Sequence, residues 1–241
     1  MNYLKVLTKG ALFIAVAISL SSCLKNKGND YVQPDISLVS IYHASPGSPA
    51  FDFGIDGYKV DYGFKYKDRA GYYQLYTGTR NIAFIKEGGT SLATDSIRTT
   101  NVTVKKDSIY SLFLIGPSTA PETLLISDKL ENPASGKANI RFINLSPDEG
   151  NFTLKAVAGT TDTTLVENVA YKKATAFSSV FPKTYTFSIY KDGNLKANTS
   201  SINITAGKNY TVWAVGLDAE SGNKAITLNV DENNSILQKK E

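Results

Sequence analysis

The sequence predicts an all-β protein with two tandem immunoglobulin-like β-sandwich domains after a signal peptide. Segments rich in Ile, Val, Thr, Tyr and Phe recur along the chain, and Gly, Pro, Asn and Asp separate them at short intervals. No stretch after Cys23 carries the apolar stripe of an amphipathic helix. Three segments also occur twice in the same order, about 100 residues apart, which is the length of one sandwich domain.

The duplicated segments define the expected domains. The similar pairs are VSIYHASP (39–46) with IRFINLSP (140–147), 63–89 with 168–194, and DSIYSLFLIG (107–116) with GKNYTVWAVG (207–216). We expect a signal peptide over 1–22, a tether over 23–35, sandwiches over 36–128 and 138–230, a linker over 129–137 and a C-terminal tail over 231–241.

The fold explains several residues of the repeat. Tyr110 and Tyr210 each follow a turn and begin an apolar strand, so the ring can be buried while the hydroxyl returns to upstream backbone. Trp213 has alternating neighbours, which indicates a core position. Pro46 and Pro147 end the strands before them, because proline cannot donate a ladder hydrogen bond. We interpret these five residues as structural.

The first residues predict the compartment. Lys5 and Lys9 precede an apolar run (11–20) and the residues Leu-Ser-Ser-Cys, a pattern typical of a secretory signal peptide. Leu-Ser-Ser-Cys resembles the bacterial lipobox, which implies that Cys23 carries acyl chains and attaches the protein to the outer membrane. Cys23 is the only cysteine, so no disulfide can form within the chain. Whether the protein faces the surface or the periplasm is left open.

The composition argues against several classes of site. Lys and Arg number 26 against 22 Asp and Glu, and no basic block occurs, so we expect no nucleic-acid partner. One histidine and one cysteine do not make a zinc site, and the acidic residues lack the dense loop of a strong calcium motif. No G-x-S-x-G element is present. We therefore expect no metal, no cofactor and no enzyme activity.

The stretch YHASPGSPAFDFGIDG (42–57) contains the only histidine of the chain. A strand over 36–43 is expected to end at the Ser-Pro bend, and an alternating strand with Phe51 and Phe53 on its apolar face follows. The stretch is similar to the signature of a bacterial family of domains of unknown function, DUF4397, approximately H-A-S-P-x-x-P-x-V-D-V-x-V-D-G. The resemblance implies secreted or surface proteins, often lipoproteins of Bacteroidetes-type bacteria, with tandem domains and no established activity. The second copy departs from it, with Asn144 for His43 and Thr153 for Asp52.

His43 has one structural interpretation and two functional ones. The structural interpretation, which we favour, is a hydrogen-bonded residue at a strand end, helped by Asp52 on the next strand. Asn144 fits this interpretation, because an asparagine can replace one hydrogen bond of a histidine. The functional alternatives make His43 a metal ligand or a general base for Ser45 or Ser48.

Residues 51–76 hold more aromatic side chains than the matching part of the second copy. Exposed tyrosines suit sugar rings or protein partners, whereas ordinary cross-strand packing is the simpler alternative for any single one. The candidate ligand-binding residues are Tyr58, Tyr62, Tyr76, His43 and Asp52, with Lys59, Lys65 and Lys67 at the rim.

Three functions are compatible with these features. The first is a non-catalytic binding or adhesion module of the cell envelope, for a glycan or an envelope protein. The second is a structural spacer or accessory subunit of an outer-membrane complex. The third, which ranks last, is a polysaccharide hydrolase, whose chemistry needs two suitably placed carboxylates.

Overall fold

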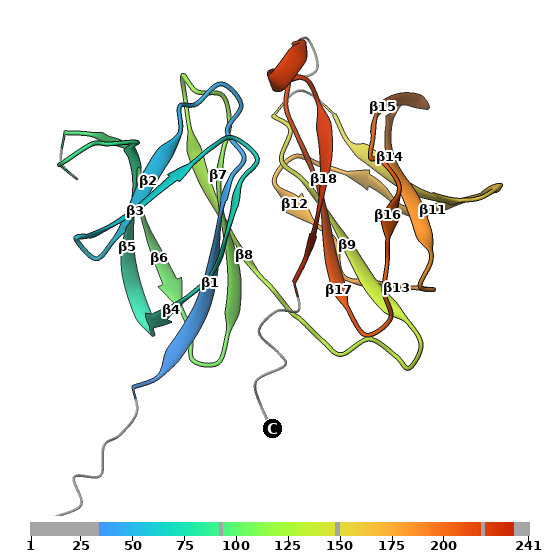
Figure 1. Ribbon diagram of the computed structural model, residues 1–241, viewed down its shortest axis with the longest axis horizontal. Coiled ribbons are helices and arrows are strands. Elements are labelled where there is room, and N and C mark those ends of the chain that lie inside the picture. Colours follow the sequence, from blue (N-terminus) through green and yellow to red (C-terminus); the bar gives the residue numbers. More distant parts are fainter. Residues whose placement is uncertain (1–33, 92–93, 148–149, 218–219, 234–241) are drawn as a thin grey trace, which may run out of the picture. The chain divides into compact units, whose positions relative to one another are not determined.

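The computed structural model describes residues 34–91, 94–147, 150–217 and 220–233 (Figure 1). Strands β1–β8 form two sheets and strands β9–β18 form two more. The predicted all-β class is therefore confirmed. The described ranges contain no helix long and apolar enough to cross a membrane. We call the β1–β8 part the first sandwich and the β9–β18 part the second sandwich.

The first sandwich has eight strands in two four-stranded sheets. One sheet has the order β4 (Arg69–Tyr76), β1 (Ile36–His43), β7 (Ile109–Ile115) and β8 (Glu122–Ser127). The other has the order β3 (Tyr58–Phe64), β2 (Phe51–Ile55), β5 (Gly78–Lys86) and β6 (Ser96–Val104). All neighbours are antiparallel except β1 and β7, which are parallel.

The second sandwich repeats this strand order. One sheet has the order β12 (Lys173–Ala174), β9 (Ala138–Asn144), β17 (Asn209–Val215) and β18 (Thr227–Glu232), and β13 (Ser178–Val180) also pairs with β9. The other has the order β11 (Thr161–Val169), β10 (Phe152–Ala158), β14 (Thr184–Lys191) and β15 (Asn194–Asn198), and β16 (Ile202–Asn203) pairs with β14. A short 3₁₀ turn (Gly222–Lys224) precedes β18.

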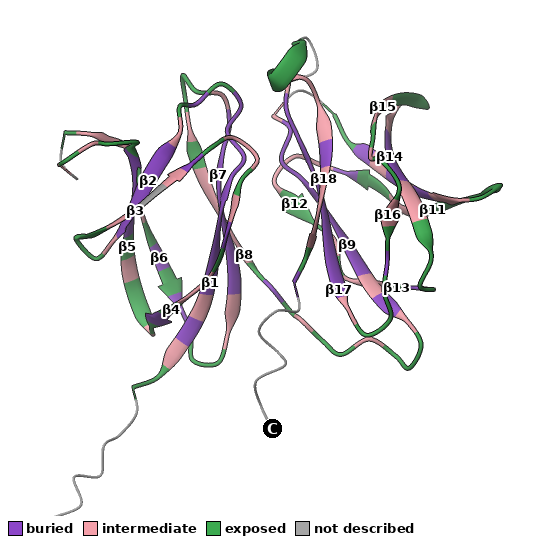
Figure 2. Cartoon of the chain, viewed as in Figure 1, coloured by how far each residue is buried: buried purple, intermediate pink, exposed green. Residues whose placement is uncertain are grey.

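Two strands of each sandwich are buried on both faces (Figure 2). In β7, Leu112 and Leu114 face the core of the first sandwich, whereas Phe113 and Ile115 face the opposite way and belong to a separate core. The same alternation occurs in β1, β9 and β17. This double burial explains why DSIYSLFLIG and its counterpart are almost continuously apolar rather than alternating.

The separate core joins the two sandwiches, and we call it the junction core. Its fully buried members are Tyr42, Ala44, Phe113, Ile115, Ile143, Leu145, Trp213 and Val215. These residues occupy equivalent places in the two copies: Tyr42 corresponds to Ile143, Ala44 to Leu145, Phe113 to Trp213 and Ile115 to Val215. Tyr66 and Tyr171, which are also equivalent, pack against it. The two sides of the junction core are therefore built from the same positions of the repeat.

Candidate functional site

His43 holds the bend that follows β1. Its Nε2 lies 3.0 Å from the carbonyl oxygen of Pro49, and its Nδ1 accepts a hydrogen bond from the backbone N–H of Ser45 at 3.4 Å. Neutral histidine with the proton on Nε2 satisfies both contacts. The side chain is fully buried against Phe51 and Tyr66, and this burial lowers the pKa of His43 below its ordinary value. His43 is therefore a neutral part of the fold and does not face solvent.

Asn144 holds the equivalent bend after β9 in the second sandwich. Its Oδ1 accepts a hydrogen bond from the N–H of Ser146 at 3.1 Å, and its Nδ2 donates to the carbonyl of Val169 at 2.9 Å. The serine after each bend also makes an equivalent contact: Ser45 donates to the carbonyl of Gly116 and Ser146 to that of Gly216. Pro46 is buried and Pro147 half-buried directly after these serines.

Asp52 has contacts other than those expected for it. Its carboxylate accepts hydrogen bonds from the backbone N–H groups of Gly63 at 2.9 Å and Gly88 at 3.2 Å, and it pairs with Lys59 at 3.2 Å. Asp52 is 4% exposed although its strand was expected to present it on a polar face, because β3 and the turn after β5 both contact its side chain. We therefore correct the expected role of Asp52: it connects β3 to the turn after β5.

The candidate tyrosines come from two different sheets. Tyr58 begins β3 and is 80% exposed, and Tyr76 ends β4 and is 60% exposed. Among the described residues, no ring contact joins them. Tyr62 belongs to β3, but its side chain lies outside the described residues. Lys65 is exposed, while Lys67 lies over the ring of Tyr66 and reaches Asn223 of the second sandwich at 3.4 Å.

The remaining predicted residues lie as follows. The hydroxyl of Tyr110 accepts a hydrogen bond from the N–H of Lys105, and the hydroxyl of Tyr210 accepts one from Thr205. Trp213 belongs to the junction core, and its indole N–H donates to Asp231 at 2.7 Å. Cys23, the expected lipid attachment site, lies outside the described residues.

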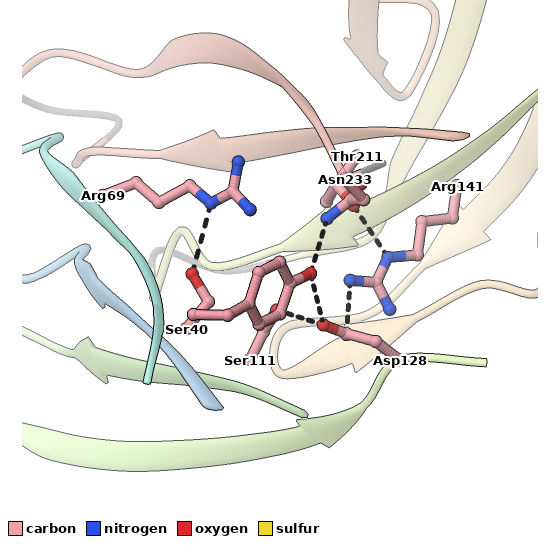
Figure 3. A network of polar contacts seen from close by, with 8 residues as sticks. Ser40, Arg69, Ser111, Asp128, Arg141, Thr211 and Asn233 are labelled. Atoms are coloured by element: carbon pink, nitrogen blue, oxygen red, sulfur yellow. Dashed lines mark hydrogen bonds and ion pairs between the residues drawn. The ribbon is translucent and has the colours of Figure 1, made fainter. Parts of the chain in front are cut away.

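A buried polar network crosses from the first sandwich to the second (Figure 3). The side chains of Asp128 and Arg141 form an ion pair at 2.6 Å with exposures of 0% and 2%. Asp128 also accepts hydrogen bonds from Ser111 at 2.7 Å and Tyr72 at 3.3 Å. Burial, followed by the charge of Asp128, raises the pKa of Tyr72 to about 12. Its hydroxyl therefore remains a donor at neutral pH.

The network continues through the second sandwich. Arg141 donates to the hydroxyl of Thr211 at 2.9 Å, Thr211 donates to Asn233 at 2.7 Å, and Asn233 reaches the hydroxyl of Tyr72 at 3.5 Å. These contacts give both buried charges further hydrogen-bonding partners, as buried ion pairs need.

A groove with a volume of about 640 Å³ lies beside this network. One wall consists of the end of β8 and the segment over 129–134, and the other consists of β9, the segment over 174–177 and Ser179. Its size falls within the range of ordinary ligand sites. Arg141 connects the groove to the buried network, because it lines the one and belongs to the other.

An interrupted edge strand forms the second wall. In the first sandwich, β4 is continuous and covers the edge of β1. In the second sandwich the equivalent segment is divided into β12 and β13, and residues 175–177 between them line the groove. The hydroxyl of Thr175 accepts a hydrogen bond from the N–H of Phe142 at 3.0 Å and so takes over a contact that a ladder carbonyl would make. The equivalent residue of the first sandwich is Ala70, which has no hydroxyl.

A small side chain keeps the groove open. The strand registers make Ala174 the counterpart of Arg69, because Ala174 faces Ile143 where Arg69 faces Tyr42. Arg69 lies at the start of β4 in the first sandwich. It donates to the hydroxyl of Ser40 at 3.2 Å and to the carbonyl of Glu232, in the second sandwich, at 2.9 Å. Ala174 is too short for such contacts, so the corresponding place in the second sandwich is open.

The groove lining suits an uncharged polar ligand. The Arg141 guanidinium lies over the ring of Phe177 at 5.1 Å. Hydroxyl and amide side chains line the same groove, and they belong to Ser127, Asn132, Asn139, Thr175 and Ser179. The charge of Arg141 is compensated by Asp128, and the other two charged residues of the lining, Lys129 and Glu131, have opposite signs. Among the described residues, no group of three or more His, Cys, Asp or Glu side chains could hold a metal ion.

The signature around His43 agrees with a family comparison. Residues 37–155 match the family model described as Domain of unknown function (DUF4397). The DUF4397 match runs from the second residue of β1 through the rest of the first sandwich and into β10, and it covers just under half of the chain. No curated protein matches the chain.

Several solved structures show distant likeness to this DUF4397-matching chain. The TIE protein of Bacillus anthracis is 11% identical with a TM-score of 0.26, and the match covers 82% of this chain and 44% of that one. A DUF3823 family protein from Bacteroides ovatus is 12% identical with a TM-score of 0.22, over 71% and 99% of the two chains. Family 41 carbohydrate-binding modules from streptococcal virulence factors are 12% identical with a TM-score of 0.23, over 80% and 96%.

Sequence reasoning did not find Asp128, Arg141 or the groove. The sequence contains one signal for the ion pair. Asp128 ends the apolar segment TLLISD, and Arg141 lies inside the apolar segment IRFIN. Such a charge in a strand with two buried faces needs a partner. The pairing itself depends on how the two sandwiches meet, and no local pattern contains that information.

Proposed function

We propose that this chain is a non-catalytic binding module whose ligand occupies the groove beside the Asp128–Arg141 pair. The observation that carries this proposal is the groove itself, which neutral hydrogen-bonding side chains line together with one aromatic ring and a buried, compensated arginine. Sites with a few convergent polar groups in a partly apolar cavity are typical of ligand binding.

The acidic groups near the groove support binding rather than hydrolysis. A glycosidase needs two carboxyl groups on either side of the bond that is cleaved. Among the described residues that line the groove, Glu131 provides the only carboxylate. Asp128 is fully engaged by Arg141, Ser111 and Tyr72.

We also propose that the module is anchored in the cell envelope through a lipidated Cys23. Support comes from the Leu-Ser-Ser-Cys motif after the basic and apolar segments. Globomycin is expected to cause accumulation of the precursor, and Cys23→Ser is expected to release the protein from the membrane fraction. A Cys23→Ser protein that stays on the membrane contradicts the anchor.

The groove is tested by filling it. Ala174→Arg introduces the residue that the first sandwich carries at the equivalent position, and Ala174 is exposed, so folding should be unaffected. We expect the variant to lose most binding of the chain to intact cells and to a glycan array. Tyr58→Ala is the matched surface control and should bind as the unmodified chain does. The reverse result, with binding lost in Tyr58→Ala and kept in Ala174→Arg, would move the site to the tyrosine surface.

A structural spacer is the second candidate function, and the junction core favours it. Two sandwiches joined by eight fully buried apolar residues form a stiff unit rather than two loosely tethered domains. This function predicts co-purification with an outer-membrane protein and no small-molecule binding in the groove.

A further inference from the structure

A second groove lies next to the first, beside β13. It has a volume of about 310 Å³, and its walls are the β10–β11 hairpin on one side and Val180, Phe181, Lys183 and Tyr185 on the other. Ser179 lines both grooves. The two grooves are therefore neighbours that share the short strand β13 as a common wall.

Each groove contains one aromatic ring beside β13. Phe177 precedes the strand and lines the first groove, and Phe181 follows it and lines the second. Phe181 is 60% exposed although the ammonium group of Lys137 lies over its ring. Phe181 is the fourth residue after Phe177, and four steps of extended chain correspond to about 13 Å. A ligand that contacts both rings must therefore be long.

The chemistry of the two linings differs in a way that a sugar chain would match. The first groove is lined by hydroxyl and amide groups together with Phe177, whereas the second is lined mainly by Ala, Thr, Leu, Val and aromatic side chains, with Lys183 as its one charged lining residue. A sugar ring has one apolar C–H face, which packs on an aromatic ring, and hydroxyl groups at its rim, which hydrogen-bond to polar side chains.

A peptide ligand fits less well. An extended peptide binds a sheet by adding a strand, and its affinity comes from a row of main-chain hydrogen bonds. The strand between the grooves, β13, has three residues, and the ladder is interrupted at 175–177. This edge offers too few main-chain groups for strand addition.

We infer that the ligand is a linear, uncharged oligosaccharide that crosses β13 and places one sugar ring on Phe177 and another on Phe181. The inference rests on the proposed binding function and names its ligand class.

Titration calorimetry of the chain without its signal peptide tests the inference. The probes are maltohexaose, cellohexaose, laminarihexaose, xylohexaose and mannohexaose, each compared with its own disaccharide. We expect one hexasaccharide to bind at least roughly tenfold more tightly than its disaccharide, because it contacts a second aromatic ring. Phe181→Ala should weaken the hexasaccharide roughly tenfold and leave the disaccharide unchanged, whereas Phe177→Ala should weaken both.

Tyr76→Ala is the matched control. Tyr76 is the counterpart of Phe181 in the first sandwich and has the same exposed fraction, 60%. The Tyr76→Ala variant is expected to leave the affinities for the hexasaccharide and for the disaccharide unchanged.

The possible failures are distinct. If a hexasaccharide binds but Phe181→Ala has no effect, the second groove is not part of the site and the proposed function stands. If none of these sugars binds while Ala174→Arg still abolishes binding to cells, the ligand class is wrong and the groove stands. If Ala174→Arg also leaves cell binding intact, both proposals are overturned.

Discussion

At the residue scale, His43 makes stability depend on pH. Burial lowers its pKa below the ordinary value of 6.5 in the folded chain. The unfolded chain therefore takes up a proton more readily as the pH falls below about 6.5, and the free energy of unfolding falls with it. Above that pH the contribution of His43 is fully present. We expect the urea midpoint to decrease between about pH 7 and pH 5.

His43→Asn isolates this effect. Asn144 shows that an asparagine can accept from the serine N–H and donate to a backbone carbonyl at this bend. The variant should fold and should lose most of the decrease in urea midpoint between those two pH values. A variant as sensitive to pH as the unmodified chain would show that another group is responsible.

A second residue-scale prediction concerns Tyr42. Its ring lies in the junction core, stacked on Phe113 with centroids 4.3 Å apart, but its hydroxyl is buried without a hydrogen-bond partner among the described residues. An unsatisfied buried hydroxyl reduces stability. Tyr42→Phe keeps the ring and removes the hydroxyl, so thermal denaturation should show equal stability or a gain of up to about 1 kcal/mol. A clear loss of stability would mean that the hydroxyl has a partner, such as a bound water.

At the element scale, the Asp128–Arg141 pair connects the end of β8 to β9. Removal of one partner leaves a buried charge, so Asp128→Leu and Arg141→Met should each reduce the free energy of unfolding by about 3–5 kcal/mol. The double variant removes both charges and should cost much less than the sum of the two single changes. Urea denaturation of the three variants measures this coupling. Additive losses would show that the two side chains act independently.

The elements also show what the sequence could predict. The strand over Ile36–His43 and its end before the Ser-Pro bend follow directly from β-branched residues and proline chemistry. The interruption between β12 and β13 does not follow from the sequence, because threonine is a common strand residue. The sign of the break is the hydrogen bond from the N–H of Phe142 to the hydroxyl of Thr175, which is visible only in the structure. The groove depends on that break, so the sequence pattern predicts a site at the exposed tyrosines and not at the groove.

At the scale of the whole molecule, the junction core should make the two sandwiches unfold together. Trp213 is the only tryptophan of the chain and lies in this core, so its fluorescence reports the contact between the sandwiches. We expect its emission and the far-UV circular dichroism to change at the same urea concentration. A shift in emission at lower urea than the loss of circular dichroism would mean that the sandwiches separate before they unfold.

The duplication predicted two similar sandwiches, but it did not predict how they meet. Continuously apolar strands such as β7 and β17 indicate two buried faces, and yet a single sequence does not say what covers the second face. The answer is the equivalent face of the other copy, a relation that exists only in three dimensions.

That self-matching contact has an evolutionary consequence. In a homodimer, one mutation alters both sides of the interface at once, so a change that suits only one side is lost. In a fused pair each position mutates alone, as Phe113 and Trp213 illustrate within the same core. One copy could thus retain Arg69 and a closed sheet edge while the other acquired Ala174 and an open one. Two copies within one chain can therefore differ, with a groove in one copy and none at the equivalent place among the described residues of the other.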